Sequence, residues 1–175
     1  MSPRLDKRWE ISQPVPPAVD SALAIYPPLV RQLLYNRGIE TRAQAEAFLN
    51  GQVLLDDPWL LKDMDSAVDR ILWGIDHGER IVIYGDYDVD GVTASALLYE
   101  ALRHLGATYV RVYIPSRFDE GYGLNTTAID ELAESGTDLI ITVDCGLRSI
   151  HEVEYANHCG LDIVITDHHY PKVEI

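Results

Sequence analysis

Acidic residues and histidines that can bind metal ions occur at three places in the chain, each directly after a short apolar run. The motifs are G-D-Y-D-V-D-G, D-C-G and D-H-H, and their candidate ligands are Asp86, Asp88, Asp90, Asp144, Asp167, His168 and His169. Carboxylate oxygens joined by one or two imidazoles suit Mn²⁺ or Mg²⁺, and Mn²⁺ tolerates nitrogen ligands better. Two such ions about 3.5–4 Å apart can clamp a phosphate, activate a water molecule and stabilise a leaving oxygen. The pattern therefore indicates metal-assisted chemistry on a phosphate ester.

Each cluster taken alone has a simpler explanation. An aspartate after a strand commonly caps the next helix or fixes a turn, and Asp90-Gly91 suits a turn. A His-His pair in a loop is more often solvated or structural than bound to metal. Three separate clusters that all follow strands are much harder to explain by turns than by one shared site. Zinc fits less well, because neither cysteine joins the clusters and oxygen dominates.

The elements that must position these clusters alternate between strands and helices. Short apolar runs predict strands at 81–84, 109–114, 139–143 and 163–166. Apolar residues at helical spacing predict helices at 94–105, 128–133 and 150–157, each stopped by a glycine. This alternation is typical of an α/β fold with a parallel sheet and helices on both faces. Because the carboxyl ends of parallel strands share one edge, residues near 88, 144 and 168 should converge there.

The segment ahead of the first predicted strand has a different character. Most of the prolines lie within residues 1–28, which are therefore expected to be extended or loosely held. Helices are predicted at 29–34, at 42–49 with Thr41 as the cap, and at 64–75. We expect a Pro-rich and helical N-terminal segment over 1–60, followed by the α/β domain over 61–175.

The net charge of −14, from 28 acidic and 14 basic residues, argues at first against binding to nucleic acid. Net charge describes the average field of a protein, however, and not a local groove. A carboxylate-rich site for divalent cations leaves an acidic surplus when the cations are not counted. Two bound dications would return four positive charges to the place where a phosphate must sit.

Hydropathy and cysteine usage predict where the chain works. No segment approaches the ~20 consecutive apolar residues that a membrane span needs, so no membrane partner is expected. The first residues, M-S-P-R-L-D-K-R-W-E, contain no apolar core of a secretory signal. Cys145 and Cys159 lack metal-type spacing and suggest free thiols in a reducing compartment. A cytoplasmic location is the expectation that follows.

The motifs resemble a known family. Y-G-D-Y-D-V-D-G at 84–91, V-D-C-G at 143–146 and T-D-H-H at 166–169 resemble the first three motifs of the DHH phosphoesterases. The loop I-P-S-R-F-D-E-G-Y-G-L at 114–124 and the segment D-M-D-S-A-V-D-R-I at 63–71 resemble more specifically the RecJ branch, the single-strand-specific DNA exonucleases. The similarity runs from about residue 28 to residue 175, and the order and spacing of the motifs make it specific.

The resemblance implies a role for each candidate residue. Asp88 and Asp90 match metal ligands of the first motif, Asp144 matches the carboxylate that bridges both metals, and His168 matches an imidazole ligand. Asp86 would bind metal or support the Asp88 loop, Asp167 would orient the histidines, and His169 would face the phosphate or lie behind the ligands. Arg117 and Arg148 would contact phosphates of the nucleic acid, although a solvated loop arginine is nearly as good an explanation of Arg117. Tyr122 would stack on a base or pack locally.

The activity that the resemblance implies is 5′-to-3′ hydrolysis of single-stranded DNA by two-metal catalysis with Mn²⁺ or Mg²⁺, in DNA repair and recombination. The implied partners are single-stranded DNA and a single-strand-binding protein, and the oligomeric state stays open. The fourth motif of the family and its second domain are not found within the 175 residues. The expectation is therefore an incomplete DHH domain, an incomplete two-metal site and weak or no activity of this chain alone.

Three other interpretations stay open. A small-substrate DHH phosphoesterase, such as a pyrophosphatase or an oligoribonuclease, shares the three motifs but lacks the helical lead-in at 29–77 and the R-F-D-E-G-Y-G-L loop. A non-catalytic scaffold remnant would keep the fold without stoichiometric Mn²⁺ binding. A phosphoacceptor receiver domain also places aspartates at strand ends, but it has no use for His168 and His169.

Overall fold

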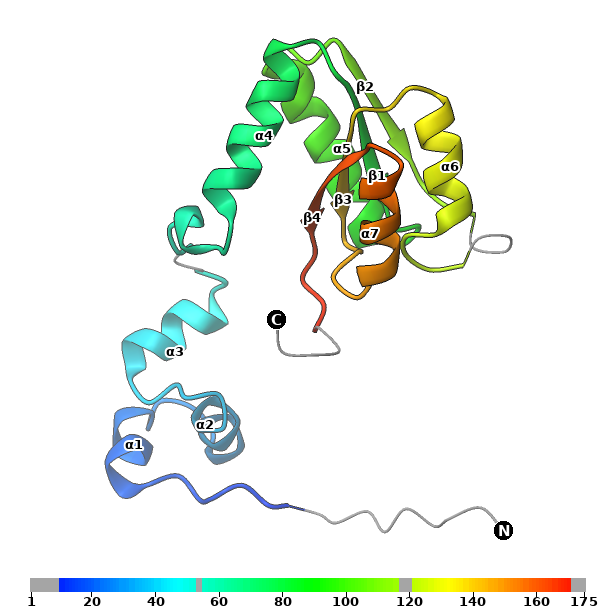
Figure 1. Ribbon diagram of the computed structural model, residues 1–175. Coiled ribbons are helices and arrows are strands. Elements are labelled where there is room, and N and C mark those ends of the chain that lie inside the picture. Colours follow the sequence, from blue (N-terminus) through cyan, green and yellow to red (C-terminus); the bar gives the residue numbers. More distant parts are fainter. Residues whose placement is uncertain (1–9, 53–54, 117–120, 171–175) are drawn as a thin grey trace, which may run out of the picture. The chain divides into compact units, whose positions relative to one another are not determined.

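The structure, a computed structural model, describes residues 10–52, 55–116 and 121–170 (Figure 1). The chain divides into two compact units, Met1–Asp57 and Pro58–Ile175. Within the described ranges, no helix combines the length and the hydropathy that crossing a bilayer requires.

The described residues of the first unit form three short helices, α1 (Pro17–Ala22), α2 (Pro28–Tyr35) and α3 (Arg42–Leu49). The expectation of an extended Pro-rich segment is wrong for α1, because Pro17 occupies the first helical turn. A proline there loses no hydrogen bond, since the first N–H groups of a helix have no partner within it. The predicted cap of α3 is confirmed, because the Thr41 side chain accepts from the N–H of Gln44 and the Gln44 side chain closes a capping box.

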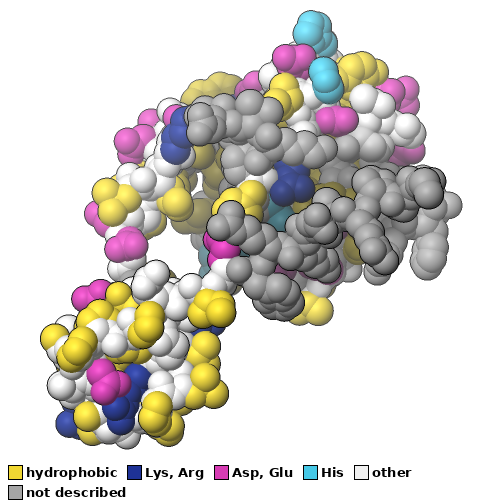
Figure 2. Space-filling model, turned by 90° about the horizontal axis from the view of Figure 1, so that it is seen from below, with side chains coloured by type: hydrophobic (Ala, Val, Ile, Leu, Met, Phe, Trp, Pro, Cys, Tyr) yellow, Lys and Arg dark blue, Asp and Glu magenta, His cyan; other side chains and the backbone are white. Residues whose placement is uncertain are grey.

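The core of the first unit is small. Leu23, Leu34 and Ala45 are buried, and the partly buried hydrophobic residues packed around them are Val19, Tyr26, Val30 and Ile39. Many hydrophobic side chains lie instead on the surface of this unit, as Figure 2 shows in yellow. The few buried residues in the described part of this unit contribute little free energy from burial of apolar surface.

Within its described part, the second unit is built on a four-stranded parallel sheet, which confirms the predicted fold class. Its elements are η1 (Pro58–Leu60), α4 (Met64–Asp76), β1 (Arg80–Gly85), α5 (Val89–His104), β2 (Tyr109–Tyr113), α6 (Thr126–Glu134), β3 (Leu139–Val143), α7 (Ile150–His158) and β4 (Asp162–Thr166). The strand order is β2-β1-β3-β4. The predicted strands and helices are present, and α5 begins five residues before the predicted start at 94.

Helices cover both faces of the sheet (Figure 1). On one face, Ile83 and Ile141 pack with Leu102 of α5 and with partly buried side chains of α4. On the other face, Tyr84 and Ile140 pack with apolar side chains of α6 and α7. Burial on both faces explains why β1 and β3 are continuous apolar runs, without the alternation of a half-exposed strand.

The strand order creates a crevice between β1 and β3. The chain leaves β1 through α5 on one face of the sheet and leaves β3 through α7 on the other face. Where neighbouring parallel strands diverge in this way, their connections leave an opening at the carboxyl ends, and ligands of open α/β sheets bind there. The sheet therefore directs attention to the residues that follow Gly85 and Val143.

Candidate metal centre

The register of the sheet brings the three motifs to one edge. Gly85 of β1 pairs with Val143 of β3, which in turn pairs with Thr166 of β4. The next residue in each strand direction is an aspartate, Asp86, Asp144 or Asp167. Three carboxylates therefore follow adjacent strands at the same level. The sequence predicted that they share one edge of the sheet, and the register shows that they are also aligned along it.

One group of three carboxylates lies between β1 and β3. Asp86, Asp88 and Asp144 each offer an oxygen, and the three oxygens lie within 4.8 Å of one another. Asp86 is buried, and its Oδ1 has no hydrogen-bond partner among the described residues. A buried oxygen without a partner is unfavourable unless a cation or a water molecule satisfies it. Together with the two neighbouring carboxylates, this oxygen makes a donor set that fits a divalent cation.

Asp88 has two tasks at the start of α5. Its Oδ1 accepts hydrogen bonds from the N–H groups of Asp90, at 2.9 Å, and Gly91, at 3.1 Å, so Asp88 is the N-cap of the helix. The hydrogen bond from Gly91 and then that from Asp90 lower the pKa of Asp88 and keep it ionised, despite some desolvation. The capping explanation is thus correct for Asp88, and the same carboxylate still belongs to the acidic group.

Gly91 allows this first turn of α5 to approach β1. A Cβ atom at position 91 would collide with the backbone of Asp86. Any side chain at this position would therefore push the helix start away from the strand end. The glycine of the D-Y-D-V-D-G motif keeps Asp86 and Asp88 close together.

Asp144 occupies an unusual backbone conformation at the centre of the site. Its φ of 62° lies in the left-handed region, which aspartate tolerates better than most residues. Its N–H donates to the backbone oxygen of Thr166 at 3.1 Å, and its side chain is only 5% exposed. Burial and then the negative charge of Asp88 raise the pKa of Asp144, against the opposing effect of His168.

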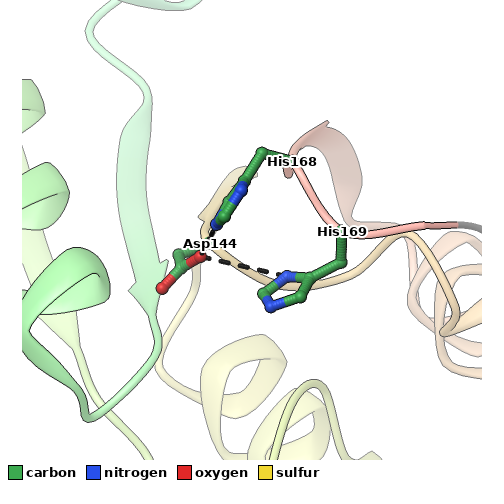
Figure 3. Close-up of side chains that lie close together, drawn as sticks. All are labelled: Asp144, His168 and His169. Carbon is green, nitrogen blue, oxygen red and sulfur yellow. Dashed lines mark hydrogen bonds and ion pairs between the residues drawn. The ribbon is translucent and has the colours of Figure 1, made fainter. Parts of the chain in front are cut away.

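A second group joins Asp144 to both histidines (Figure 3). Nε2 of His168 lies 2.9 Å from Oδ1 of Asp144, and Nδ1 of His169 lies 3.9 Å from the same oxygen. An octahedral ion with bonds of about 2.1 Å places neighbouring ligands about 3 Å apart, so the first distance suits two ligands of one ion. Asp144 is therefore the carboxylate common to both groups.

Asp167 holds His169 from behind. Its Oδ1 accepts from the backbone N–H of His169 at 3.0 Å and lies 2.7 Å from Nδ1 of the ring, while its Oδ2 accepts from the N–H of Leu147 at 3.0 Å. Burial would raise the pKa of Asp167, but the hydrogen bonds outweigh burial and lower it. The hydrogen bond to Asp167 in turn raises the pKa of His169. Asp167 thus contacts His169, and no hydrogen bond to His168 is among its described contacts.

Asp90 lies in the first turn of α5 and is exposed. It belongs to neither group of three, but it lines a cavity of about 590 Å³ together with Asp144, Asp167 and His168. The rest of the lining comes from Thr93, Ala94, Leu97, Val143 and Thr166. The cavity extends from Asp144 and His168 along α5. It can therefore hold an ion or part of a substrate next to Asp144.

Comparison with known proteins identifies the family. The DHH family, N-terminal domain, matches residues 80–175, the stretch that starts at β1 and contains every acidic and histidine residue of the site. The chain belongs to the DHH family. The resemblance seen in the three motifs is thereby confirmed.

Relatives of this DHH chain carry a more specific name. It is 44% identical over 171 residues to the single-stranded-DNA-specific exonuclease RecJ of Bacillus subtilis, covering 96% of this chain and 22% of that protein. It is 37% identical over 146 residues to RecJ of Escherichia coli, covering 83% of this chain and 25% of that protein. The chain thus spans about a quarter of the length of these relatives.

A solved structure agrees with this relationship. RecJ of Thermus thermophilus, in complex with Mn²⁺, matches 91% of this chain and 22% of its own, with 30% identity and a TM-score of 0.63. The DHH chain therefore shares its fold with a structure that holds a manganese ion.

Of the two arginines expected to contact phosphate, Arg148 lies within the described residues and Arg117 does not. Arg148 is exposed, and its Nε donates to the backbone oxygen of Tyr170 at 2.7 Å, so this contact links the α7 side of the site to the chain after His169. Contact of either residue with nucleic acid stays a prediction.

Sequence reasoning missed one polar contact of the DHH site. Tyr122 was expected to stack on a base or to pack locally, yet its hydroxyl donates to the backbone oxygen of Asp144 at 3.2 Å and lies 3.3 Å from Nδ1 of His169. The only signal in the sequence is the pair of glycines on either side, since Gly121 and Gly123 both have positive φ. Such a pair indicates a turn but not what the tyrosine contacts.

Proposed function

We propose that the chain forms the metal-binding part of a single-strand-specific DNA exonuclease of the DHH family. The observation that carries this proposal is the convergence of Asp86, Asp88, Asp144, His168 and His169 on two overlapping groups that share Asp144. The names of the relatives, single-stranded-DNA-specific exonucleases from Bacillus subtilis and Escherichia coli, support the choice of substrate over small phosphate esters.

Two divalent cations, Mn²⁺ or Mg²⁺, fit the donor set. Asp86, Asp88 and Asp144 would hold one, and Asp144 with His168 would hold the other, with Asp90 on the wall of the same cavity. When bound, such ions supply positive charge that activates a water molecule and neutralises the phosphate during in-line attack. The metal bound in the Thermus thermophilus structure, Mn²⁺, supports this assignment.

The residues of the chain itself would orient the reacting groups. Asp88, fixed by the amide groups of α5, and Asp144, fixed between β3 and β4, keep two carboxylates at set positions. Asp167 accepts from Nδ1 of His169, which leaves Nε2 of that ring as the nitrogen available to a phosphate oxygen. Because the pKa of His169 is raised, a protonated ring that donates to phosphate becomes more populated near neutral pH.

The proposal includes direction, setting and partners. Hydrolysis would proceed from the 5′ end and release nucleoside 5′-monophosphates, in DNA repair and recombination in the cytoplasm. A single-strand-binding protein would deliver the substrate, and Arg148 and Arg117 would contact its phosphates.

Calorimetric titration of the chain with Mn²⁺ tests the metal centre. We expect stoichiometric binding, and we expect Asp144→Asn to weaken it by more than about 100-fold, because one carboxylate contacts both sites. Asp76→Asn makes the same chemical change at an exposed position at the end of α4 and should bind Mn²⁺ normally. Absence of binding by the unsubstituted chain, or equal binding by Asp144→Asn, would contradict the proposal and favour a non-catalytic scaffold.

A chimera tests the activity. The 171 matched residues replace their counterparts in the Bacillus subtilis exonuclease, and the chimera is given 5′-labelled single-stranded DNA, duplex DNA, dinucleotides and pyrophosphate. We expect Mn²⁺-dependent release of mononucleotides from the single strand, little from the duplex, and none in the Asp144→Asn chimera. A folded chimera that cleaves only dinucleotides or pyrophosphate would identify a small-substrate phosphoesterase instead.

A further inference from the structure

Tyr122 reaches the metal centre from the segment between β2 and α6. Its hydroxyl donates to the backbone oxygen of Asp144 at 3.2 Å and lies 3.3 Å from Nδ1 of His169. The two rings also meet edge to face, with centroids 6.0 Å apart and planes at 80°. One side chain therefore touches both a carboxylate residue and a histidine of the site.

The backbone around Tyr122 is held so that the ring points to the site. Gly121 and Gly123 have φ values of 80° and 83°, a conformation that residues with a side chain rarely adopt. The hydroxyl of the buried Tyr84 in β1 donates to the oxygen of Gly123 at 3.0 Å, and Leu124 is buried in the core. The tyrosine is thus anchored to the sheet on its C-terminal side, although the residue as a whole is 53% exposed.

The contact with Tyr122 stabilises the unusual backbone conformation of Asp144. Its left-handed backbone is intrinsically unfavourable and persists only when neighbours hold it. Its N–H donates to the backbone oxygen of Thr166 in β4, and its carbonyl oxygen accepts from Tyr122, so both peptide groups of Asp144 are hydrogen-bonded. Without the hydrogen bond from Tyr122, the peptide after Asp144 could rotate and change the direction of the carboxylate.

The hydroxyl of Tyr122 can serve both neighbours at once, because it donates its proton to the carbonyl oxygen of Asp144 and keeps its lone pairs for a second contact. Because Nδ1 of His169 donates to Asp167, the lone pairs of the Tyr122 oxygen face the same N–H. Tyr122 and Asp167 therefore both favour the ring state with a proton on Nδ1.

We propose that Tyr122 is a positioning residue that fixes the backbone of Asp144 and the ring of His169 through its hydroxyl, and so sets the geometry of the metal centre. The part of this inference that concerns metal rests on the proposed function. The contact itself does not, since residues of the chain alone form it.

The first test measures Mn²⁺ binding by calorimetry in the unsubstituted chain, in Tyr122→Phe and in Tyr109→Phe. Tyr109 is an equally exposed tyrosine at the opposite end of β2 and provides the matched control. We expect Tyr122→Phe to bind Mn²⁺ about 10-fold more weakly, as is typical when a group behind a ligand is lost. The melting temperature without metal should stay within about 4 °C of the unsubstituted chain. Equal Mn²⁺ affinity, or a general loss of the fold, would overturn the positioning role.

The second test needs no metal. In the metal-free chain, ¹H–¹³C spectra should show the ring signals of His169 shifted in Tyr122→Phe and unchanged in Tyr109→Phe, while the signals of His151 on α7 stay in place in both. Unshifted His169 signals would overturn the inference even if Mn²⁺ binds. Failure of the unsubstituted chain to bind Mn²⁺ would contradict the proposed function alone, and the spectra would still decide the role of Tyr122.

Discussion

The two edges of the sheet use charge in opposite ways. At the amino edge, Arg70 of α4 pairs with Glu79 at 2.7 Å and with Asp162 at the start of β4 at 2.6 Å. At the carboxyl edge, Asp86, Asp88 and Asp144 lie together, and among the described residues no Lys or Arg forms an ion pair with them. Opposite charges at one edge hold the elements together, whereas like charges at the other repel.

The like charges at the carboxyl edge lower the stability of the metal-free fold. Carboxylates that are this close favour protonation or a bound cation, so their arrangement is not explained by the stability of the metal-free fold. Sites that carry function often keep such unfavourable arrangements. Four predictions test the contrast between the two edges.

The largest effect should come from restoring charge balance at the carboxyl edge. Mn²⁺ at about 100 times its dissociation constant should stabilise the chain by about 2.7 kcal/mol, because the ion binds only the folded state. For a chain of 175 residues this corresponds to a rise of roughly 5–10 °C in melting temperature. Scanning calorimetry with Mn²⁺ and with EDTA measures the rise, and Ca²⁺ at the same concentration provides a charge-matched control. An unchanged melting temperature would contradict the binding of Mn²⁺ at the carboxyl edge.

The next largest effect should come from breaking the amino edge. Arg70→Met removes the cation from a partly buried contact with Glu79, in which the two side chains are 22% and 15% exposed, and from a contact with the largely exposed Asp162. It should destabilise the fold by about 1–3 kcal/mol, mainly through the carboxylate of Glu79 left without its partner. Arg42→Met removes an exposed pair with Glu46 in α3 and should leave the free energy of unfolding almost unchanged. Urea unfolding measures both. Mn²⁺ affinity should be unaltered in either variant, and a loss of affinity in Arg70→Met would show that the two edges are coupled.

A smaller effect concerns the pH dependence of the metal-free chain. The raised pKa of Asp144 means that its ionisation opposes folding, so stability is lost as the pH rises from its ordinary pKa of ~3.9 through the raised value. Asp144→Asn should therefore be more stable than the unsubstituted chain at pH 7, and the difference should shrink as the pH falls toward 4.

Asp88→Asn supplies the contrast. The pKa of Asp88 is lowered, so its ionised form contributes stability that is present above the ordinary pKa and lost as the pH falls through the lowered value. Asparagine still caps the helix, so the substitution mainly removes charge. Asp88→Asn should be less stable than the unsubstituted chain at pH 7. Urea titrations in EDTA between pH 4 and 7 measure both variants, and equal signs for the two would contradict the assignment.

The smallest effect is an absence of reaction at Cys145. This buried thiol lies next to Asp144 and contacts the backbone oxygen of Tyr84 at 3.7 Å. Burial, with the negative charges of Asp167, Asp86 and Asp144, raises its pKa to about 12. A thiol reagent at pH 8 should therefore modify the exposed Cys159 alone, and both cysteines should react in denaturant. Rapid reaction of both thiols in the folded chain would mean that the reagent reaches the buried Cys145, and would contradict its burial behind the carboxyl edge.

Much of the site could be predicted from local pattern. Apolar runs identified the strands that end at Gly85, Val143 and Thr166, and the residues beyond them were the right ones to examine. The capping explanation of Asp88 and the metal-binding one looked like alternatives, yet one carboxylate serves as cap and also lies in the acidic group. Pattern could not separate the two uses, because a cap is a local contact and an ion site is not.

Other features lay beyond local pattern. The positive φ of Asp144 depends on the hydrogen bonds to Thr166 and Tyr122, which come from different parts of the chain. The short helix at Pro17–Ala22 was missed, because prolines favour extended backbone except at the first turn of a helix.

The alternation of strands and helices, and the kinds of side chain at the strand ends, follow from local sequence pattern. Hydrophobic period, caps and glycine stops act over a few residues, so they can be read along the chain. Packing between segments tens of residues apart sets the register of the parallel strands, and this register places Asp86, Asp144 and Asp167 at one level. The contact of Tyr122 with the site likewise arises in the folded chain, because it depends on where the loop after β2 returns to the sheet.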